Sequence, residues 1–339
     1  MASYLDGKTV LVTGGTGYIG SALVRDLLAR SVSKVIVFGR DETKQFVMKR
    51  RIADSRLETV VGDVRDCQTV RQVFERYGAN LVYHAAAMKH VTMCELFPLE
   101  ALKTNVIGTQ NVVDLARRHN VQRLINISTD KAVHATSVLG ATKLVAERSV
   151  ANAGYTSVRF GNVAGSRGSV IPVLIEEMLR HKKLTITDSR VTRFVMTIQD
   201  AVNLILKATE LATGEDIFIL KMKAFRLPDL VDILVNEVAP QLGLDSRTIE
   251  VKEIGSVCGE KLHEELVAYE ESEIMYELPD MYVLINDEKN ASETGAKRVV
   301  SHEFTSSNVQ YLPRGDLSGI VHSVLEKMRS PEWDSQRFS

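Results

Sequence analysis

The feature that most constrains the fold is a glycine-rich turn between a strand pattern and a helix pattern near the N-terminus. Lys8–Thr13 is a short run rich in β-branched residues, Gly14–Gly20 is rich in glycine, and Ser21–Leu28 repeats apolar residues at helical spacing. In this order the three segments let backbone N–H groups approach a pyrophosphate at the N-terminus of the helix. The pattern predicts an α/β fold that binds a dinucleotide through Thr13, Gly14, Thr16, Gly17, Tyr18, Ile19 and Gly20.

Composition narrows the class of protein. The chain has 339 residues, 45% hydrophobic and 25% charged, which is a soluble globular profile with room for one large or two modest domains. Its net charge is −1 and its basic residues are scattered, so we expect neither a nucleic-acid partner nor a membrane surface. Cys67, Cys94 and Cys258 are too far apart for a disulfide framework or a zinc site, and no metal is expected. Without a signal peptide or an apolar run of roughly 20 residues, we expect a cytoplasmic protein that does not insert into membranes.

The end of the second strand pattern bears on which dinucleotide binds. Lys34–Phe38 is followed by Gly39, Arg40 and Asp41, with Lys44 one turn further on. NAD-binding sites usually place a carboxylate here for the ribose 2′-hydroxyl. Glycine leaves room for a 2′-phosphate instead, and arginine can pair with that phosphate through two nitrogens. NADP is therefore favoured over NAD, although Asp41 keeps NAD open and Arg40 could simply be solvated.

The next two strand patterns also end in residues suited to a cofactor. Leu57–Val64 would bring Asp63 to an adenine amino group and Val64 against the ring. Leu81–His84 runs into small residues that let a cofactor lie close, and a lysine follows; Ala85, Ala86 and Lys89 are the candidates. The pattern from Pro98 to His119 predicts one long helix whose apolar stripe is interrupted by Asn105. A buried asparagine needs hydrogen-bond partners, and bracing the neighbouring strand is one use for it.

A fifth strand pattern, Arg123–Ile127, stops abruptly in Ser128-Thr129-Asp130-Lys131, and a helix is predicted over residues 139–153 with Lys143 four residues after Leu139. Ligands of open α/β sheets bind outside the carboxyl ends of the strands. A hydroxyl, a carboxyl and an amine delivered there together could serve as hydrogen-bond donor, acid and base. The plainer interpretation is a surface turn, because Ser, Thr and Asp are common in turns.

These motifs resemble those of the extended branch of the short-chain dehydrogenase/reductase superfamily. Within it, the chain is most similar to nucleotide-sugar 4,6-dehydratases acting on UDP-N-acetylglucosamine, over about residues 7 to 315. Lys131 is the specific feature, since related hexose dehydratases have glutamate there. The matching stretches include the glycine turn and Gly39–Glu42, Gly62–Asp66, Ala85–Val91, Lys103–Thr109, Ser128–Ala132, Gly140–Lys143, Arg159–Val163, Thr192–Phe194 and Gly259–Leu262.

One position departs from the superfamily. Its usual pair is a tyrosine, which takes the substrate's hydroxyl proton, and a lysine four residues later, which holds the nicotinamide ribose. This chain keeps Lys143 but has Leu139 in place of the tyrosine, so oxidation by the tyrosine route is excluded. Some members of the group also lack the tyrosine. The acceptor of the O4 proton is left open among Asp130, Lys131 and a water held by Thr129 and Lys143.

The resemblance implies a reaction and a set of site residues. The sugar is oxidised at C4, water is lost across C5 and C6, and the stored hydride returns to C6. Lys131 would be the base, Asp130 the acid and Thr129 the hydrogen-bond donor to the C4 oxygen, and Lys131 would have to lose its proton more readily than a free amine. Arg193 would bind the diphosphate, or else form a structural ion pair with Asp188 or Asp200. Further implied cofactor contacts are Asn105, Ser128, Lys143, Asn162 and Val163, and implied substrate contacts are Lys89, Asn162, Val170, Thr187, Arg193, Glu260 and Lys261.

The expected architecture is an α/β Rossmann fold, a doubly wound parallel sheet with helices on both faces, with a smaller C-terminal α/β substrate-binding region. We expect the dinucleotide domain over residues 1–165, the substrate region mostly over 166–315 with some segments returning to the sheet, and a C-terminal helix and tail over 316–339. The family resemblance implies a homo-oligomer. Two alternatives to the dehydratase are a UDP-HexNAc 4-epimerase and a catalytically inactive NADP-binding regulatory protein.

Overall fold

The computed structural model describes residues 3–285, 291–292, 294–299, 303–330 and 333. Contacts divide the chain into two units, both of them discontinuous in sequence. The first holds the residues up to Phe160 together with Gln199–Lys221 and Leu266–Glu303, and the second holds Gly161–Ile198, Met222–Glu265 and the residues from Phe304 onward. The sequence prediction placed the dinucleotide domain at residues 1–165 and expected some segments of 166–315 to return to its sheet, and the two returning segments are Gln199–Lys221 and Leu266–Glu303.

A single large sheet organises the first unit. Over the described residues its strand order is β16-β14-β15-β10-β6-β5-β4-β1-β2-β3. The pairs from β3 through β10 are all parallel, and the order 3-2-1-4-5-6 is that of a Rossmann fold. The predicted doubly wound parallel sheet is therefore confirmed. The parallel strands are β1 Thr9–Thr13, β2 Lys34–Gly39, β3 Leu57–Val61, β4 Leu81–His84, β5 Arg123–Ile127, β6 Thr156–Arg159 and β10 Ile217–Leu220.

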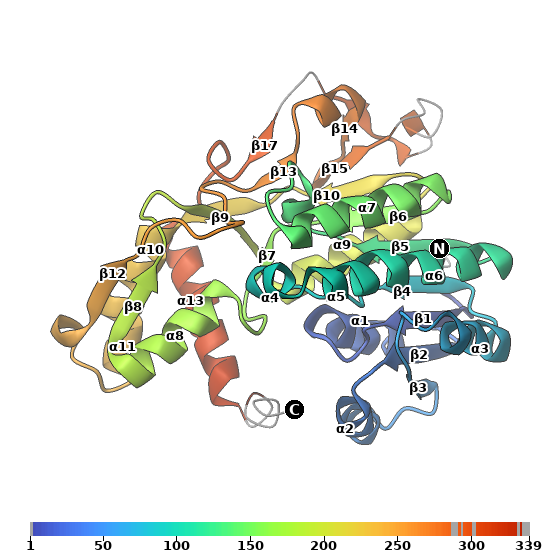
Figure 1. The fold of residues 1–339 in the computed structure, drawn as a ribbon, viewed down its shortest axis with the longest axis horizontal. Coiled ribbons are helices and arrows are strands. Elements are labelled where there is room, and N and C mark those ends of the chain that lie inside the picture. The colour runs from blue at the N-terminus through green and yellow to red at the C-terminus, as the bar shows by residue number, and fades with distance from the viewer. Residues whose placement is uncertain (1–2, 286–290, 293, 300–302, 331–332, 334–339) are drawn as a thin grey trace. The chain divides into compact units, whose positions relative to one another are not determined.

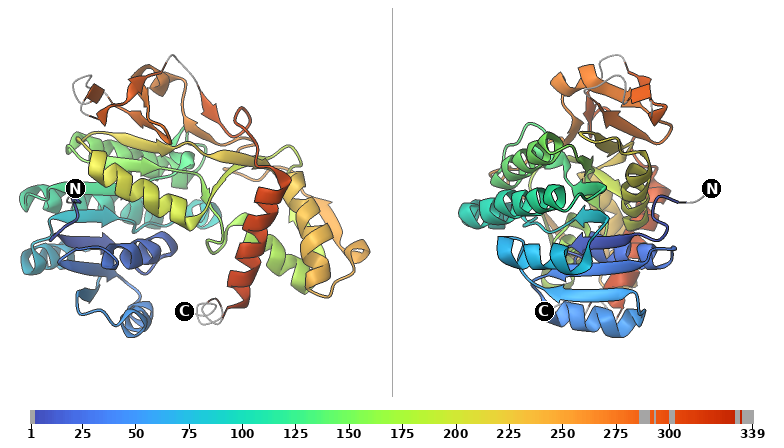
Figure 2. Two further views of the ribbon diagram at one scale, coloured as in Figure 1. Left: turned by 180° about the vertical axis from the view of Figure 1, so that it is seen from behind. Right: turned by 90° about the vertical axis from the view of Figure 1, so that its right-hand side faces the viewer.

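Helices cover both faces of this sheet. In Figure 1, α3, α6 and α7 lie over one face, and the view from behind in Figure 2 (left) shows α1 and α9 over the other. Apolar residues of the strands, of α3 and of α6 form one buried core, which is why this strand sequence is apolar almost throughout. The helices of this unit are α1 Tyr18–Leu28, α2 Glu42–Ile52, α3 Cys67–Tyr77, α4 Val91–Leu96, α5 Pro98–Leu102, α6 Gly108–Arg118, α7 Val138–Asn152 and α9 Ile198–Leu211, with 3₁₀ turns η2 Asp130–Ala132 and η5 Glu270–Ile274.

An antiparallel extension lies beyond β10. Strands β15 (Met281–Leu284), β14 (Met275–Glu277) and β16 (Lys297–Arg298) pair antiparallel in that order. No local pattern distinguished these short strands from loop, because successive pairing outward from β10 rather than intrinsic propensity fixes them.

The predicted long helix from Pro98 is confirmed at its start, where proline occupies the first turn of α5. It does not run on as a regular α-helix. A π-helical turn, η1 (Lys103–Ile107), separates α5 from α6 and contains the buried Asn105. One extra residue per turn shifts the apolar stripe, which explains the break in the sequence pattern.

The second unit has its own apolar core, built from its helices and short strands. Its helices are α8 Val170–His181, α10 Leu227–Ile233, π-turn η3 Leu234–Val238, α11 Ala239–Gln241, 3₁₀ turn η4 Ser246–Thr248 and α13 Arg314–Arg329. Its strands form the sheet β11-β9-β7 (Lys223–Arg226, Thr192–Met196, Asn162–Val163) and the pair β12-β8 (Glu250–Glu253, Lys183–Ile186). Strand β17 (Phe304–Thr305) also belongs to this unit, whereas β13 (Glu265–Val267) has its first residue in this unit and the others in the first unit. The predicted loose tail falls almost entirely outside the described residues.

Candidate active site

The glycine turn joins β1 to α1, and its first glycine has no substitute. Gly14 has φ +67°, and a Cβ there would come within 2.7 Å of the backbone nitrogen of Ala86. Gly17, the N-cap residue of α1, brings no side chain to the helix terminus. The turn therefore leaves the N-terminus of α1 open to an anion. Thr13 ends β1, Thr16 lies in the turn, and Tyr18, Ile19 and Gly20 form the first turn of α1.

The end of β2 offers space and an exposed guanidinium. Around Gly39, the nearest atoms that an added Cβ would meet lie 3.9 and 4.0 Å away. The Arg40 side chain is 59% exposed, and its Nη1 is 3.8 Å from Asp63 Oδ2. The Asp41 carboxylate, by contrast, caps α2 by accepting from the Lys44 backbone N–H and forms an ion pair with Lys44 Nζ at 2.7 Å. The Asp41 carboxylate is thus engaged by the helix that it caps, whereas the Arg40 guanidinium is exposed to solvent.

Asp63 lies just after β3, where the sequence placed it, but another residue holds its carboxylate. Arg65 donates to it from the backbone N–H at 2.9 Å and from Nε at 2.8 Å. Partial burial acts to raise the pKa of Asp63, but these hydrogen bonds outweigh it, so the pKa lies below its ordinary range. Val64 beside it is buried. The hydrogen bonds from Arg65 to Asp63 were not predicted.

At the end of β4, Ala85 and Ala86 lie against Gly14, and Lys89 is exposed. The side chain of Asn105, in the π-turn, forms hydrogen bonds with this segment. Its Oδ1 accepts from Met88 N–H at 2.8 Å, and its Nδ2 donates to Met88 O at 3.1 Å and to Thr142 Oγ1 at 3.1 Å. Asn105 therefore braces the loop after β4 against α7, which bears out its expected need for partners.

The end of β5 gathers the predicted catalytic side chains. Asp130 is 1% exposed, and its Oδ1 accepts from Thr129 Oγ1 at 2.7 Å and from Lys131 Nζ at 3.1 Å. The Lys131 side chain is 25% exposed, so its amine is turned to its neighbour rather than to bulk water. Ser128 Oγ is buried and has no hydrogen-bond partner in the part of the chain that the structure describes.

Helix α7 approaches this cluster closely. A Cβ on Gly140 would lie 2.1 Å from Lys131 O, so only glycine allows the helix backbone to pack here. Lys143 is buried, and its Nζ donates to Ile127 O at 2.6 Å. Burial lowers the pKa of Lys143 to about 8, with Glu147 acting in the opposite direction. Gly140 thus sets the spacing and Lys143 ties the helix to the strand end.

Leu139 faces an apolar cluster. It is 4% exposed and packs with Cys94 and Ala101, while Met88, Val91 and Val138 lie at the edge of the cluster. Nothing in this cluster is a strong proton acceptor. The structure therefore agrees with the expectation that this position carries no proton.

Arg159 is a residue whose importance the sequence did not reveal. It is completely buried at the end of β6 and donates to both carboxylate oxygens of Glu147 and of Glu271. It also donates to Leu266 O at 2.9 Å. These hydrogen bonds tie β6 to α7 through Glu147 and to η5 through Glu271. The signal available in the sequence was an arginine at the end of the short strand pattern Thr156–Arg159.

The remaining predicted residues belong to the second unit. Asn162 and Val163 form β7, Val170 opens α8, and Thr187 follows β8. Lys261 Nζ lies 3.3 Å from Glu265 Oε1. Their predicted roles stay predictions.

Arg193 in β9 is mostly buried and has partners other than those expected. Its Nη2 donates to Glu260 Oε1 at 2.6 Å, and its Nε lies 3.7 Å from Glu264 Oε1. The alternative of an ion pair with Asp188 or Asp200 is wrong for Asp188, which pairs with Arg190 at 2.7 Å. Arg193 is held by carboxylates from a segment about 70 residues away, which no local pattern indicates.

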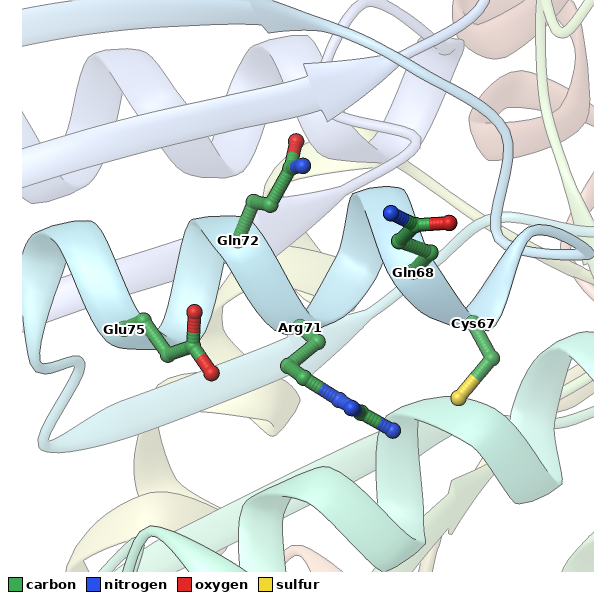
Figure 3. Close-up of a pocket in the computed structure, with 5 residues that line it drawn as sticks. All are labelled: Cys67, Gln68, Arg71, Gln72 and Glu75. Carbon is green, nitrogen blue, oxygen red and sulfur yellow. The ribbon is translucent and has the colours of Figure 1, made fainter.

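A surface hollow of about 480 Å³ lies elsewhere in the first unit. Figure 3 shows its lining residues, all from the single helix α3: Cys67, Gln68, Arg71, Gln72 and Glu75. None of them belongs to the predicted site, and we assign the hollow no role. Among the described residues, no group of His, Cys, Asp or Glu could hold a metal ion, and no helix is long and apolar enough to cross a membrane.

The strand order, the glycine turn and the cluster at the end of β5 define a Rossmann-fold protein of the extended short-chain dehydrogenase/reductase class. The family model described as polysaccharide biosynthesis protein matches residues 10–286. The chain therefore belongs to that family.

Three relatives of similar coverage have names that state different functions or none. An uncharacterized membrane protein of Methanocaldococcus jannaschii is 43% identical over 293 residues, covering 84% of this chain and 87% of its own. A UDP-glucose 4-epimerase of Rickettsia rickettsii is 35% identical over 324 residues, 90% and 92% of the two chains. A UDP-N-acetylglucosamine 4,6-dehydratase (inverting) of Campylobacter jejuni is 34% identical over 340 residues, 94% and 98% of the two chains.

Two solved structures are similar over nearly their full lengths. Pen from Bacillus thuringiensis has a TM-score of 0.88 and 37% identity, covering 95% of this chain and 99% of that one. The dTDP-glucose 4,6-dehydratase DesIV from Streptomyces venezuelae, solved with NAD and TYD, has a TM-score of 0.71 and 21% identity, covering 94% and 98%. At that identity DesIV supports the fold alone.

Proposed function

We propose that the protein is an NADP-dependent UDP-N-acetylglucosamine 4,6-dehydratase that forms a UDP-4-keto-6-deoxy-HexNAc. The observation that carries the proposal is the hydrogen-bonded cluster at the end of β5, in which the buried Asp130 accepts from Thr129 and Lys131, with Lys143 tied to the same strand end. The similarity to the Campylobacter jejuni dehydratase supports the substrate. Soluble cytoplasmic location and a homo-oligomeric state belong to the same proposal.

The first unit fits a nicotinamide dinucleotide. Gly14 lets the glycine turn pack closely on the backbone of Ala85 and Ala86, the N-terminus of α1 carries no capping side chain, and Ser128 Oγ is a buried hydroxyl that lacks a partner within the described chain. Arg40 and the space at Gly39 favour the 2′-phosphate of NADP, while Asp41 is engaged as a helix cap. NAD, which DesIV binds, is the alternative. When bound, such a cofactor supplies oxidation at C4 of the sugar and reduction at C6, with no net consumption.

The residues at the end of β5 are proposed to carry out the two proton transfers of the elimination. Loss of water across C5 and C6 needs a base for the C5 proton, which a ketone at C4 makes acidic, and an acid for the departing 6-hydroxyl. We assign Lys131 as the base and Asp130 as the acid. The Thr129 hydroxyl, which here donates to Asp130 Oδ1, would turn to donate to the C4 oxygen, and the O4 proton released on oxidation at C4 would pass to Asp130, Lys131 or a water held by Thr129 and Lys143. Lys143, beside them, would hold the cofactor ribose.

Lys131 Nζ lies 3.1 Å from Asp130 Oδ1, so a proton can pass between the two groups and the pair can supply both the base and the acid. A proton passed from Lys131 Nζ to the Asp130 carboxyl leaves a neutral amine beside a neutral acid, which is the state that elimination needs. Burial of Asp130 favours this uncharged state, because ions lose hydration in the interior.

The second unit is proposed to bind the nucleotide portion, through Asn162, Val170, Thr187, Arg193, Glu260 and Lys261. Arg193 already has two carboxylate neighbours. For a diphosphate to take its guanidinium, Glu260 must move, since its carboxylate would repel the phosphates. The similarity in Gly259–Leu262 to the family supports this assignment.

A 4-epimerase of the same class of substrate is the second candidate, because epimerases are among the relatives at about the same identity. Epimerisation needs a group that takes and returns the O4 proton on either face of the ring. Leu139 in its apolar cluster cannot do so. This favours the dehydratase.

Incubation of the purified protein with NADP and UDP-N-acetylglucosamine in deuterated water separates the candidates. The dehydratase forms a ketone and places deuterium at C5. An epimerase gives the C4 epimer without deuterium at C5, and an inactive regulatory protein leaves the sugar unchanged. Either of these results would overturn the proposal.

A further inference from the structure

His84, the last residue of β4, lies at the centre of a buried chain of hydrogen bonds. It is in register with Thr13, the last residue of β1, and its Nδ1 is 2.8 Å from Thr13 Oγ1. On the other side of the ring, Nε2 is 3.0 Å from Thr109 Oγ1 on α6. All three side chains are at most 1% exposed, so water does not compete for these contacts.

The partners fix where each hydrogen lies. Thr109 Oγ1 donates its hydrogen to Asn105 O at 2.6 Å, since a carbonyl can only accept. Toward His84 it must therefore accept, and Nε2 carries the ring hydrogen. Nδ1 is then an acceptor, and Thr13 donates to it. The Thr13 oxygen in turn accepts from Ala86 N–H at 3.4 Å, so the chain is consistent from end to end.

Each end of this chain holds a segment of the proposed site. Thr13 precedes Gly14, whose turn packs on Ala86. Asn105 O belongs to the π-turn, and the Asn105 side chain contacts Thr142, the neighbour of Lys143. His84 thus connects the glycine turn to the helix that carries Lys143.

We propose that His84 is a positioning residue, held as the neutral Nε2–H tautomer, which fixes the glycine turn through Thr13 and the π-turn through Thr109. Burial, together with the charge of Lys143, lowers the pKa of His84 to about 3, so the tautomer persists across physiological pH. The inference rests on the proposed function only for the roles given to the glycine turn and Lys143.

Two amide substitutions separate the two halves of the chain. In His84→Asn the amide oxygen replaces Nδ1 and keeps Thr13, whereas in His84→Gln the amide nitrogen reaches the place of Nε2 and keeps Thr109. We expect His84→Gln and Thr13→Val to weaken NADP binding by about tenfold, the usual effect of one hydrogen bond. We expect His84→Asn and Thr109→Val, which loosen the segment behind Lys143, to lower the rate at saturating NADP by about tenfold and to weaken NADP binding less than the first two variants do, since Lys143 is one of several proposed cofactor contacts.

Thr209→Val is the matched control. Thr209 Oγ1 lies 2.9 Å from the hydroxyl of Tyr83, the neighbour of His84 on the opposite face of β4, and it is equally buried. This variant should lower thermal stability and alter neither NADP affinity nor rate. If all five variants lose affinity and rate together, in proportion to their loss of stability, His84 is merely structural and the inference is wrong.

A second readout needs neither substrate nor activity. Nitrogen NMR of the His84 ring should show a protonated Nε2 and an unprotonated Nδ1 throughout pH 6 to 9. A proton on Nδ1, or titration within that range, would overturn the inference. Absence of dehydration by the wild-type protein would instead overturn the proposed function and leave the NMR result standing.

Discussion

Lys143 Nζ donates a 2.6 Å hydrogen bond to Ile127 O, the carbonyl that ends β5 immediately before the Ser128–Lys131 segment. The amine is buried, and its ordinary partner in the superfamily, a tyrosine, is replaced by Leu139. The contact therefore fixes helix α7 to the strand end without help from that tyrosine.

The lowered pKa of Lys143 predicts a pH dependence of stability. Its pKa in the folded protein is about 8, against an ordinary value of 10.5. Between these values the unfolded chain holds a proton that the folded protein has lost, so the free energy of unfolding rises with pH. Relative to Lys143→Met, the wild type should gain up to about 3 kcal/mol from pH 8 to 10.5. Urea unfolding of both proteins across that range measures it, and a flat or falling difference would contradict the assignment.

Gly140→Ala should separate α7 from the catalytic loop. The added Cβ would meet backbone, Lys131 O at 2.1 Å, so the helix must shift. We expect at least a hundredfold loss of dehydration and a destabilisation of about 3 kcal/mol. Gly319→Ala is the control, because Gly319 lies within α13 and a Cβ there meets nothing within 4 Å. It should stabilise by about 0.5 to 1 kcal/mol with unchanged activity. Equal effects of the two substitutions would refute the steric argument.

Arg40→Ala tests the choice of cofactor. Loss of the guanidinium should weaken NADP binding by about tenfold or more while NAD binding stays within about twofold. Arg50→Ala on α2, whose guanidinium lies over the Phe46 ring, is the control and should affect neither dinucleotide. Fluorescence titration with both dinucleotides measures the ratio. The assignment to NADP fails if the Arg40 variant binds both dinucleotides as the wild type does.

Much of this site followed from the sequence, because its signals are local. The glycine turn, the ends of β2 and β5, and the spacing from Leu139 to Lys143 depend on residues close together in the chain. The β-branched runs fixed the parallel strands, whose burial on both faces makes their sequences almost continuously apolar.

What the sequence missed depends on distant partners. The π-turn at Asn105 requires contacts with Met88 and Thr142, and Arg159 is neutralised by Glu271, 112 residues away. Arg193 was expected to bind the diphosphate or else to pair with Asp188 or Asp200, and in the structure its ion pairs are with Glu260 and Glu264. Such pairings are decided by which loops the fold brings together.

Leu139→Met tests whether this position takes part in proton transfer. Leucine and methionine have similar volumes, so the apolar cluster with Cys94 and Ala101 should lose less than about 1.5 kcal/mol. Dehydration should proceed at the wild-type rate. Leu139→Tyr should overpack the cluster, cost about 1 to 3 kcal/mol, and bring no gain in rate. A faster reaction in the tyrosine variant would show that this position can carry the O4 proton, which contradicts the expectation.

The most direct test of the central claim measures deuterium at C5 of the sugar in Lys131→Ala. The protein is incubated with NADP and UDP-N-acetylglucosamine in deuterated water, beside the wild type and a Lys103→Ala control, whose lysine pairs with Glu100 on the surface. We predict that the Lys131 variant binds NADP with wild-type affinity but incorporates no deuterium and forms no ketone product, while the control does both. Deuterium incorporation by the Lys131 variant at the wild-type rate would contradict the account.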